Sequence, residues 1–226
     1  MSDVLRAAWL VLGKDLAIER RTREIVVSTA LFSLLVAVLA SLSFYLDDVD
    51  ARAFAPGVLW IAVSFSGVLA VGRSFARERD NEAMRGLLLS PVPPAGIYLG
   101  KAASTLVFLA IVEALLLPVV AILYRVDLGR VLLPTLPVLA LGTLGQVLAG
   151  TLFGAMTVRT GARDLLVAVV VFPLVAPALL AAVVATRELF APGEALETLR
   201  WCQILLAYDL VVGTAGVWMF GPLVRD

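Results

Sequence analysis

Histidine is absent from this sequence of 226 residues, and cysteine occurs once, as Cys202. Without histidine the chain cannot form a Ser-His-Asp triad, a histidine-ligated zinc site or the usual axial ligation of haem. A single cysteine excludes an intrachain disulfide and a Cys-x-x-Cys redox site. Charge is also scarce, since charged residues make up 16% of the chain, with eighteen basic and eighteen acidic side chains. This balance gives no global positive field, so we expect no nucleic-acid partner.

Apolar residues are what the sequence has in excess. They make up 61% of the chain, and the mean hydropathy is +0.99, whereas soluble domains average about 45–50% apolar residues. The sequence therefore predicts an all-α integral membrane protein, with residues 1–226 forming a single transmembrane domain. Six apolar runs are long enough to cross a bilayer. They cover about residues 25–46, 54–72, 95–124, 131–158, 165–186 and 203–224.

Residues 1–24 precede the first of these runs. Leu5, Trp9, Leu12 and Leu16 recur at helical spacing, with charged residues elsewhere around the wheel, which predicts a helix lying in the membrane interface. A cleaved signal peptide is the alternative. The apolar run that follows has 22 residues, more than the ~7–15 of a signal sequence, so we expect it to be a span.

Basic residues in the loops predict the orientation. If the amino terminus lies in the cytoplasm, the cytoplasmic segments hold 13 Lys and Arg residues and the opposite side holds 5. Because Lys and Arg are retained on the cytoplasmic side, both termini are expected there.

The longest polar interruption is residues 73–101, RSFARERDNEAMRGLLLSPVPPAGIYLGK. Up to about Leu89 its spacing predicts a short amphipathic helix, and the prolines that follow predict an extended corner. Such a cytoplasmic segment is either a docking surface that transmits force or a solvated loop. Gly96, Gly100 and Lys101 resemble a phosphate-binding loop only superficially, because the spacing is one residue short and no Ser or Thr follows the lysine. We expect Lys101 to extend to the cytoplasmic interface, and any ATP to be bound by another subunit.

Three polar residues are expected at membrane depth: Glu113, Gln146 and Asp209. Each is either part of a translocation path or a partner in a hydrogen bond between helices. Tyr208 and Gln203 are candidate neighbours of Asp209. Gly150 and Gly154 form a GxxxG pattern, which predicts close helix packing, within the chain or between subunits. Several prolines inside the third, fourth and fifth apolar runs are predicted to kink or break their helices, namely Pro118, Pro134, Pro137, Pro173 and Pro177.

Four segments together resemble the CcmB family, the haem exporter protein B of cytochrome c maturation. They are APGVLWIAVSFSGVLAVGRSFARERD (55–80), LLLSPVPPAGIYLGK (87–101), LGTLGQVLAGTLFGAM (141–156) and FPLVAP (172–177). LLLSPVP after an acidic helix is the most specific part. The resemblance implies a six-span, export-type ABC permease fold, with an N-terminal interfacial helix and a cytoplasmic coupling helix in the loop 73–94, between the second and third spans.

The resemblance also implies partners and a function. It implies that the interfacial N-terminal helix and the 73–101 loop dock onto a CcmA-like ATPase, in a complex with CcmC-like and CcmE-like proteins in the inner (plasma) membrane of a bacterial cell. The residues expected to make this contact are Arg77, Glu78, Arg79, Glu82, Met84, Arg85 and Leu88. Glu82 replaces the glycine and Arg85 the second acidic residue of a motif common in the family. No catalytic residue, metal site or directly bound cofactor is expected, so ATP is bound by the partner and haem is at most cargo.

Three functions remain open at this point. The first is coupling of ATP hydrolysis to haem export or to release of the haem-loaded chaperone, with two copies of the chain paired to match two ATPase subunits. The second is a membrane scaffold that transports nothing. The third is an export permease for another substrate.

Overall fold

The computed structural model describes residues 2–43, 48–80, 92–160, 164–191 and 197–225. All the regular structure in these ranges is helical. The helices are α1 (Ser2–Thr22), α2 (Glu24–Ser43), α3 (Asp48–Asp80), α5 (Pro94–Leu123), α6 (Leu128–Thr160), α7 (Asp164–Phe190) and α8 (Thr198–Arg225). Within the described ranges six helices, all but α1, are long and apolar enough to cross a membrane. The predicted all-α, six-span fold class is therefore confirmed.

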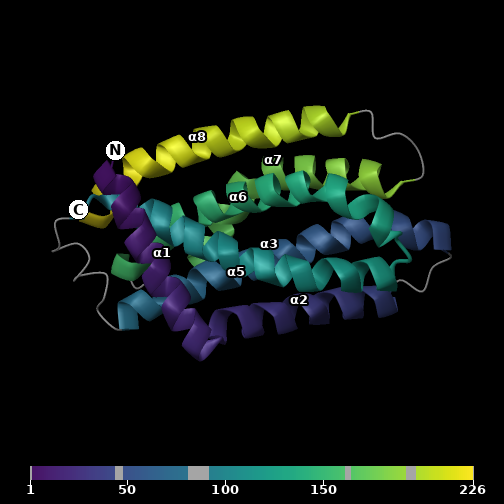
Figure 1. Cartoon of the computed structure of the whole chain (residues 1–226), viewed down its shortest axis with the longest axis horizontal. Coiled ribbons are helices and arrows are strands. Elements are labelled where there is room, and N and C mark those ends of the chain that lie inside the picture. The colour runs from purple at the N-terminus through teal and green to yellow at the C-terminus, as the bar shows by residue number, and fades with distance from the viewer. Residues whose placement is uncertain (1, 44–47, 81–91, 161–163, 192–196, 226) are drawn as a thin grey trace.

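The six long helices lie side by side, and α1 crosses one end of the bundle obliquely (Figure 1). Both termini lie at that same end, which is on the left of Figure 1. α6 packs against α3, α5, α7 and α8, and α1 packs mainly against α5. An oblique helix at the end of a bundle is the arrangement expected of an interfacial helix that precedes the first span.

The α1–α2 connection is a single residue, Arg23. Its φ of 53° lies in the left-handed region, which ends α1 at Thr22 and turns the chain into α2. The Arg23 amide donates to the carbonyl of Glu19 at 2.7 Å, and the Arg23 carbonyl accepts from the amide of Val27 at 3.1 Å. These bonds satisfy backbone groups that a helix end would otherwise leave unpaired. The elbow therefore fixes the direction in which α1 leaves the first span.

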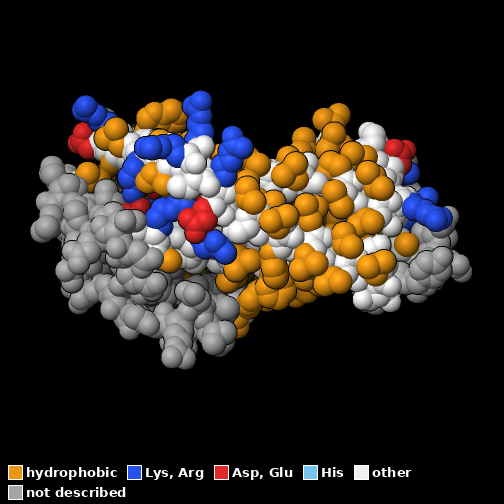
Figure 2. Space-filling view, turned by 90° about the horizontal axis from the view of Figure 1, so that it is seen from below, with side chains coloured by type: hydrophobic (Ala, Val, Ile, Leu, Met, Phe, Trp, Pro, Cys, Tyr) orange, Lys and Arg blue, Asp and Glu red, His pale blue; other side chains and the backbone are white. Residues whose placement is uncertain are grey.

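The interior is built from interlocking aromatic and aliphatic side chains. Trp60 and Tyr124 belong to one buried cluster, and Phe75, Tyr98 and Phe220 to another. The hydrophobic segment of α3 is 67% buried, whereas those of α2 and α8 are each 28% buried. α2 and α8 therefore expose apolar faces, and Figure 2 shows a wide apolar band between two charged ends. Such a band matches the hydrocarbon layer of a bilayer.

The predicted end of the second span at residue 72 is wrong, and the prolines that are predicted to kink or break their helices do not break them. α3 continues through residues 73–80, so the charged segment begins as an extension of the second span rather than as a separate helix. α5, α6 and α7 continue past the prolines inside them, so these residues do not break the helices. Prolines are tolerated in membrane helices because neighbouring groups satisfy the freed carbonyls. Residues 81–91, which include the rest of the expected coupling helix, lie outside the described residues.

Candidate functional site

Lys101 lies in α5 and is almost completely buried, with 1% of its surface exposed. Its Nζ lies 3.0 Å from Asp15 Oδ2 on α1 and 2.6 Å from Glu78 Oε1 on α3. It also donates to Ser74 Oγ at 3.4 Å. An unpaired buried ammonium would cost several kcal/mol, and these contacts offset that cost. The expectation that Lys101 extends to the membrane surface is wrong, because two carboxylates hold it inside.

Lys14 on α1 completes this arrangement. It forms an ion pair with Glu78 Oε1, and its Nζ lies 3.3 Å from Asp15 Oδ1. Ser104 Oγ donates to Asp15 Oδ2 at 3.0 Å. Lys14 and Lys101 are the only lysines in the sequence, since the other sixteen basic residues are arginines. Both lysines bind the same carboxylate oxygen of Glu78. Their two positive charges balance the negative charges of Asp15 and Glu78.

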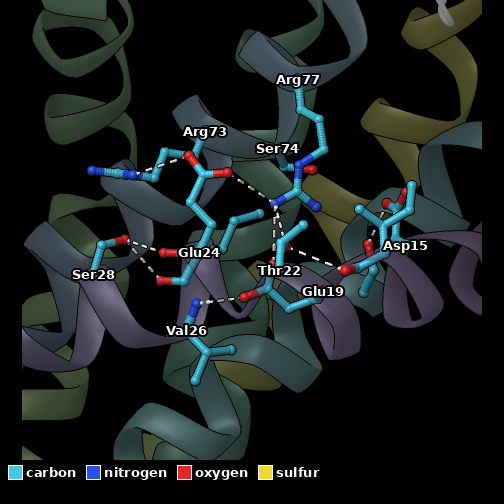
Figure 3. Close-up of polar contacts among 12 residues, drawn as sticks. Asp15, Glu19, Thr22, Glu24, Val26, Ser28, Arg73, Ser74 and Arg77 are labelled. Atoms are coloured by element: carbon cyan, nitrogen blue, oxygen red, sulfur yellow. Dashed lines mark hydrogen bonds and ion pairs between the residues drawn. The ribbon is translucent and has the colours of Figure 1, made fainter. Parts of the chain in front are cut away.

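Arg77, one residue before Glu78, joins α3 to the elbow. Its Nη2 donates to Glu19 Oε2 at 3.2 Å and to Thr22 Oγ1 at 3.4 Å, and it lies 3.6 Å from Glu24 Oε2. Figure 3 shows the Arg77 guanidinium lying between Glu19 and Glu24, with Arg73 on the other side of Glu24. The distance from Arg73 Nη1 to Glu24 Oε1 is 3.4 Å. A single turn of α3 thus holds both α1 and the beginning of α2.

We call this set of ionised residues the junction cluster. It has four basic and four acidic members, so its formal charge is zero: Lys14, Asp15, Glu19, Glu24, Arg73, Arg77, Glu78 and Lys101. Its members come from α1, α2, α3 and α5. Three of its members lie on α1, which crosses the end of the bundle that carries both termini (Figure 1), so the cluster lies at that end.

Close packing of α1 on α5 brings the cluster together. A Cβ atom on Gly96 would lie 2.6 Å from Ala7 Cβ, and one on Gly100 would lie 2.6 Å from Val11 Cβ. Small residues four apart allow helix backbones to approach in lipid, so Gly96 and Gly100 are a GxxxG packing site for α1. In the sequence, the same two glycines and Lys101 resemble an incomplete phosphate-binding loop. The GxxxG spacing itself was the sequence signal for the contact with α1.

The expected ATPase contacts begin within the cluster. Arg77 and Glu78 lie in the last described turns of α3. Arg77 contacts α1 and the start of α2, whereas Glu78 contacts α1 and α5. Glu78 is buried, so in this structure it forms part of the junction and not of the surface. The Arg79 side chain and Glu82, Met84, Arg85 and Leu88 lie outside the described residues. Arg73, Arg77 and Glu78 of the cluster therefore lie at the start of the segment 73–94 in which the coupling helix was expected.

Glu113, Gln146 and Asp209 all lie beside the middle of α6. Thr143 on α6 donates a hydrogen bond to Glu113 on α5, and Gln146 Nε2 on α6 donates to the Ser64 carbonyl on α3 at 2.7 Å. Asp209 on α8 is 4% exposed and packs against Gly145 of α6. Glu113 and Gln146 thus take part in hydrogen bonds between helices. Through the three polar groups, α6 contacts α5, α3 and α8.

Asp209 differs from the other two. Neither of its carboxylate oxygens has a hydrogen-bond partner among the described residues. The hydroxyl of Tyr208, a proposed neighbour, instead donates to the Leu174 carbonyl at 3.1 Å, and Gln203 is exposed. Tyr208 packs against the same Gly145 as Asp209, so it is a neighbour of Asp209 that does not hydrogen-bond to the carboxylate.

Gly150 and Gly154 face α3 within the same chain. A Cβ on Gly150 would lie 3.0 Å from Val71 Cγ2, and one on Gly154 would lie 2.6 Å from Phe75 Cδ2. Phe75 in turn lies beneath Lys101, whose Nζ is 5.9 Å from the ring centroid. Through Gly150 and Gly154, the contact between α3 and α6 therefore extends from the junction cluster toward the middle of α6.

Metal chemistry finds no support in this arrangement. Within the described ranges, no group of three or more His, Cys, Asp or Glu side chains is placed to hold a metal ion. The junction cluster instead contains the paired charges of a structural connection between helices.

Comparison with known proteins gives one family. The model of the CcmB protein family matches residues 6–224, which include the junction cluster and the polar groups beside α6. A search of curated proteins finds no significant match.

Proposed function

Since the chain belongs to the CcmB protein family, a membrane component of the haem-exporter ABC system of cytochrome c maturation, we propose that it is the coupling permease of that complex. In this proposal, ATP hydrolysis by a CcmA-like ATPase drives haem export or release of the haem-loaded chaperone. The chain itself is non-catalytic. It lies in the bacterial inner membrane with both termini in the cytoplasm, next to CcmC-like and CcmE-like proteins, and two copies pair to match two ATPase subunits.

The junction cluster is the observation that supports coupling. Glu78 lies two residues before the end of α3, and the chain continues directly into residues 81–91, where we place the ATPase contact. Glu78 is tied to α5 through Lys101 and to α1 through Lys14. Breaking one partner of a buried pair costs about 3–5 kcal/mol, so the three helices should move together rather than slide apart.

Haem itself is handled indirectly in this proposal. With no histidine, the chain would have to ligate haem iron through methionine, tyrosine or Cys202. We therefore propose that it does not coordinate the iron, and that movement of the spans releases the loaded CcmE-like chaperone from the CcmC-like protein. True export through the dimer interface is the alternative. A haem-dependent difference spectrum from the purified subunit would contradict the first version.

The experiment is to purify the tagged chain from its native membrane in mild detergent and to measure the ATPase rate of the copurified complex. Lys101→Met and Glu78→Gln should lower the ATPase rate and the yield of cytochrome c while the ATPase still copurifies. Charge reversal at Glu82 and Arg85 should weaken copurification itself. Arg200→Gln is the matched control, because Arg200 makes a 3.4 Å ion pair with Glu197 on the exposed surface of α8.

The scaffold function makes the opposite prediction. A chain that only anchors its partners would keep its ATPase rate and cytochrome c yield in all four cluster and loop variants, as long as the complex assembles. A chain that purifies without any nucleotide-binding partner would contradict the coupling proposal altogether.

A further inference from the structure

A pocket of about 650 Å³ lies where α1, the start of α2 and α5 meet. Its volume is in the range of small-molecule sites, which run from about 300 to 1,000 Å³. Gly13 and Ala17 of α1, Val27 of α2 and Ile111 of α5 contribute to its apolar lining. This pocket shares Glu19 with the junction cluster, and none of its lining residues is one of the polar groups beside α6.

Two arginines at the pocket have no counter-ion in the ranges that the structure describes. Arg20 ends α1 and Arg23 forms the elbow, and neither guanidinium has an ion pair among the described residues. Glu19, the third charged residue of the lining, is already bound by Arg77 and by the amide of Val26. The pocket therefore presents two positive charges that form no ion pair within the described part of the chain.

The backbone at Arg23 adds to this picture. A φ of 53° is a conformation in which glycine is usually found, and a larger side chain there is strained. The elbow nevertheless carries an arginine, which places its charge at the mouth of the pocket.

The position of the pocket relative to the membrane identifies the occupant. Arg20 and Arg23 come just before Glu24, where the first candidate span begins, whereas Val27 and Ile111 lie inside spans. Val27 and Ile111 are exposed on the bundle surface, as is Leu31 one turn further along α2. The pocket thus joins a positive mouth at the membrane interface to an apolar wall that faces the acyl chains.

We propose that this pocket binds one anionic phospholipid. Its phosphate oxygens accept hydrogen bonds from Arg20 and Arg23, and one acyl chain lies along Val27 and Ile111. A zwitterionic lipid offers the same chain with less net negative charge, so the site should distinguish the two by charge. This site does not depend on the coupling proposal, because it involves neither nucleotide nor the ATPase partner.

The test is native mass spectrometry of the full chain in detergent, titrated with phosphatidylglycerol or phosphatidylcholine. Phosphatidylglycerol should bind at one site of higher affinity. Arg20→Gln combined with Arg23→Gln should weaken it roughly thirtyfold, since each basic residue near a membrane surface contributes about a fivefold gain in affinity for anionic lipid. Arg21→Gln is the matched control, because Arg21 is also an exposed residue in the last turn of α1 but does not line the pocket. Its affinity should stay within about twofold of the wild type.

A second variant tests the apolar part. A Cβ on Gly13 would meet nothing within 4 Å, so Gly13→Leu can fill the pocket without disturbing the helix. It should abolish the high-affinity phosphatidylglycerol site while leaving all charges in place. Equal binding of the two lipids, or an unchanged affinity in the double arginine variant, would overturn the proposal. So would dissociation of a dimer by Gly13→Leu with lipid binding unchanged, because the pocket would then be covered by a second copy of the chain.

Discussion

Removing the charges of Lys101 and Glu78 together should destabilise the protein by less than the sum of the two single losses. Lys14, Asp15, Glu78 and Lys101 form a neutral group of two bases and two acids. Lys101→Met leaves one uncompensated negative charge in a buried site, and Glu78→Gln leaves one positive charge. Each should cost about 3–5 kcal/mol, the usual cost of leaving one partner of a buried ion pair alone.

The double variant restores neutrality. Lys14 remains beside Asp15 at 3.3 Å, and Ser104 still donates to Asp15 at 3.0 Å. The free energy of unfolding of the double variant should therefore fall by less than the sum of the two single losses, by up to about 3 kcal/mol. Lys101→Met keeps most of the side-chain volume, so the comparison reports charge rather than a cavity.

Equilibrium unfolding in mixed detergent micelles, followed by helical circular dichroism, measures all four proteins of the cycle. Additive single losses of less than about 1 kcal/mol each would refute the reasoning, because that is the size expected of solvent-exposed ion pairs. Such a result would mean that the junction cluster is hydrated and cannot hold α1, α3 and α5 together.

Three further predictions concern packing and accessibility. Gly100→Val should lower stability by about 1–3 kcal/mol, because its Cβ would lie 2.6 Å from Val11 Cβ, whereas Gly57→Ala, with nothing within 4 Å, should be neutral or stabilising in the same unfolding assay. Asp209→Asn should leave stability unchanged or raise it, since neither carboxylate oxygen makes a described hydrogen bond; a loss above about 1 kcal/mol in thermal unfolding would contradict this. Amine-reactive labelling read by mass spectrometry should modify Lys14 and spare Lys101, whose side chains are 34% and 2% exposed, and Glu78→Gln should increase labelling of Lys101.

Much of the fold follows from local pattern. Each span is recognisable in the sequence as a long apolar run, because a helix needs about twenty such residues in succession to cross a bilayer. The predicted second span nevertheless ended at residue 72, while α3 continues to Asp80. Charges usually end a span, but Arg73, Arg77 and Glu78 are bound by α1, α2 and α5. Those partners are distant in sequence, so periodicity within one segment could not reveal them.

Lys101 shows the same limit at the candidate site. A lone lysine near the end of a span is most simply expected to reach for water. Its burial depends on Asp15 and Glu78, which α1 and α3 bring to it only after the helices pack. The GxxxG spacing of Gly96 and Gly100 was readable from the sequence, whereas its partner helix was not. The three polar residues at membrane depth were also readable from the sequence. Only the structure shows that Glu113 and Asp209 lie beside α6, the helix that carries Gln146.

The packing of α3 on α6 shows how a displacement at residues 81–91 could reach the middle of the membrane. Gly142, Gln146, Gly150 and Gly154 recur every four residues along α6. All four contact α3. Gly142 packs against Trp60, and Gln146 contacts Ser64 and Gly67. Gly150 packs against Val71, and Gly154 packs against Val71 and Phe75.

Glycines at these positions leave little free volume between the two backbones, and packed interiors respond to a push by shifting as units rather than by compressing. The ion pairs of Glu78 fix the register of α3 at the end of this contact. An apolar contact of equal stability could slide along the helix, whereas the Glu78 carboxylate must stay beside the two lysines that neutralise it. A movement of α3 along its axis should therefore carry α6 with it, together with the hydrogen bonds of Glu113 and Gln146. For this reason coupling should be lost by breaking the register at Glu78, even where the ATPase still binds.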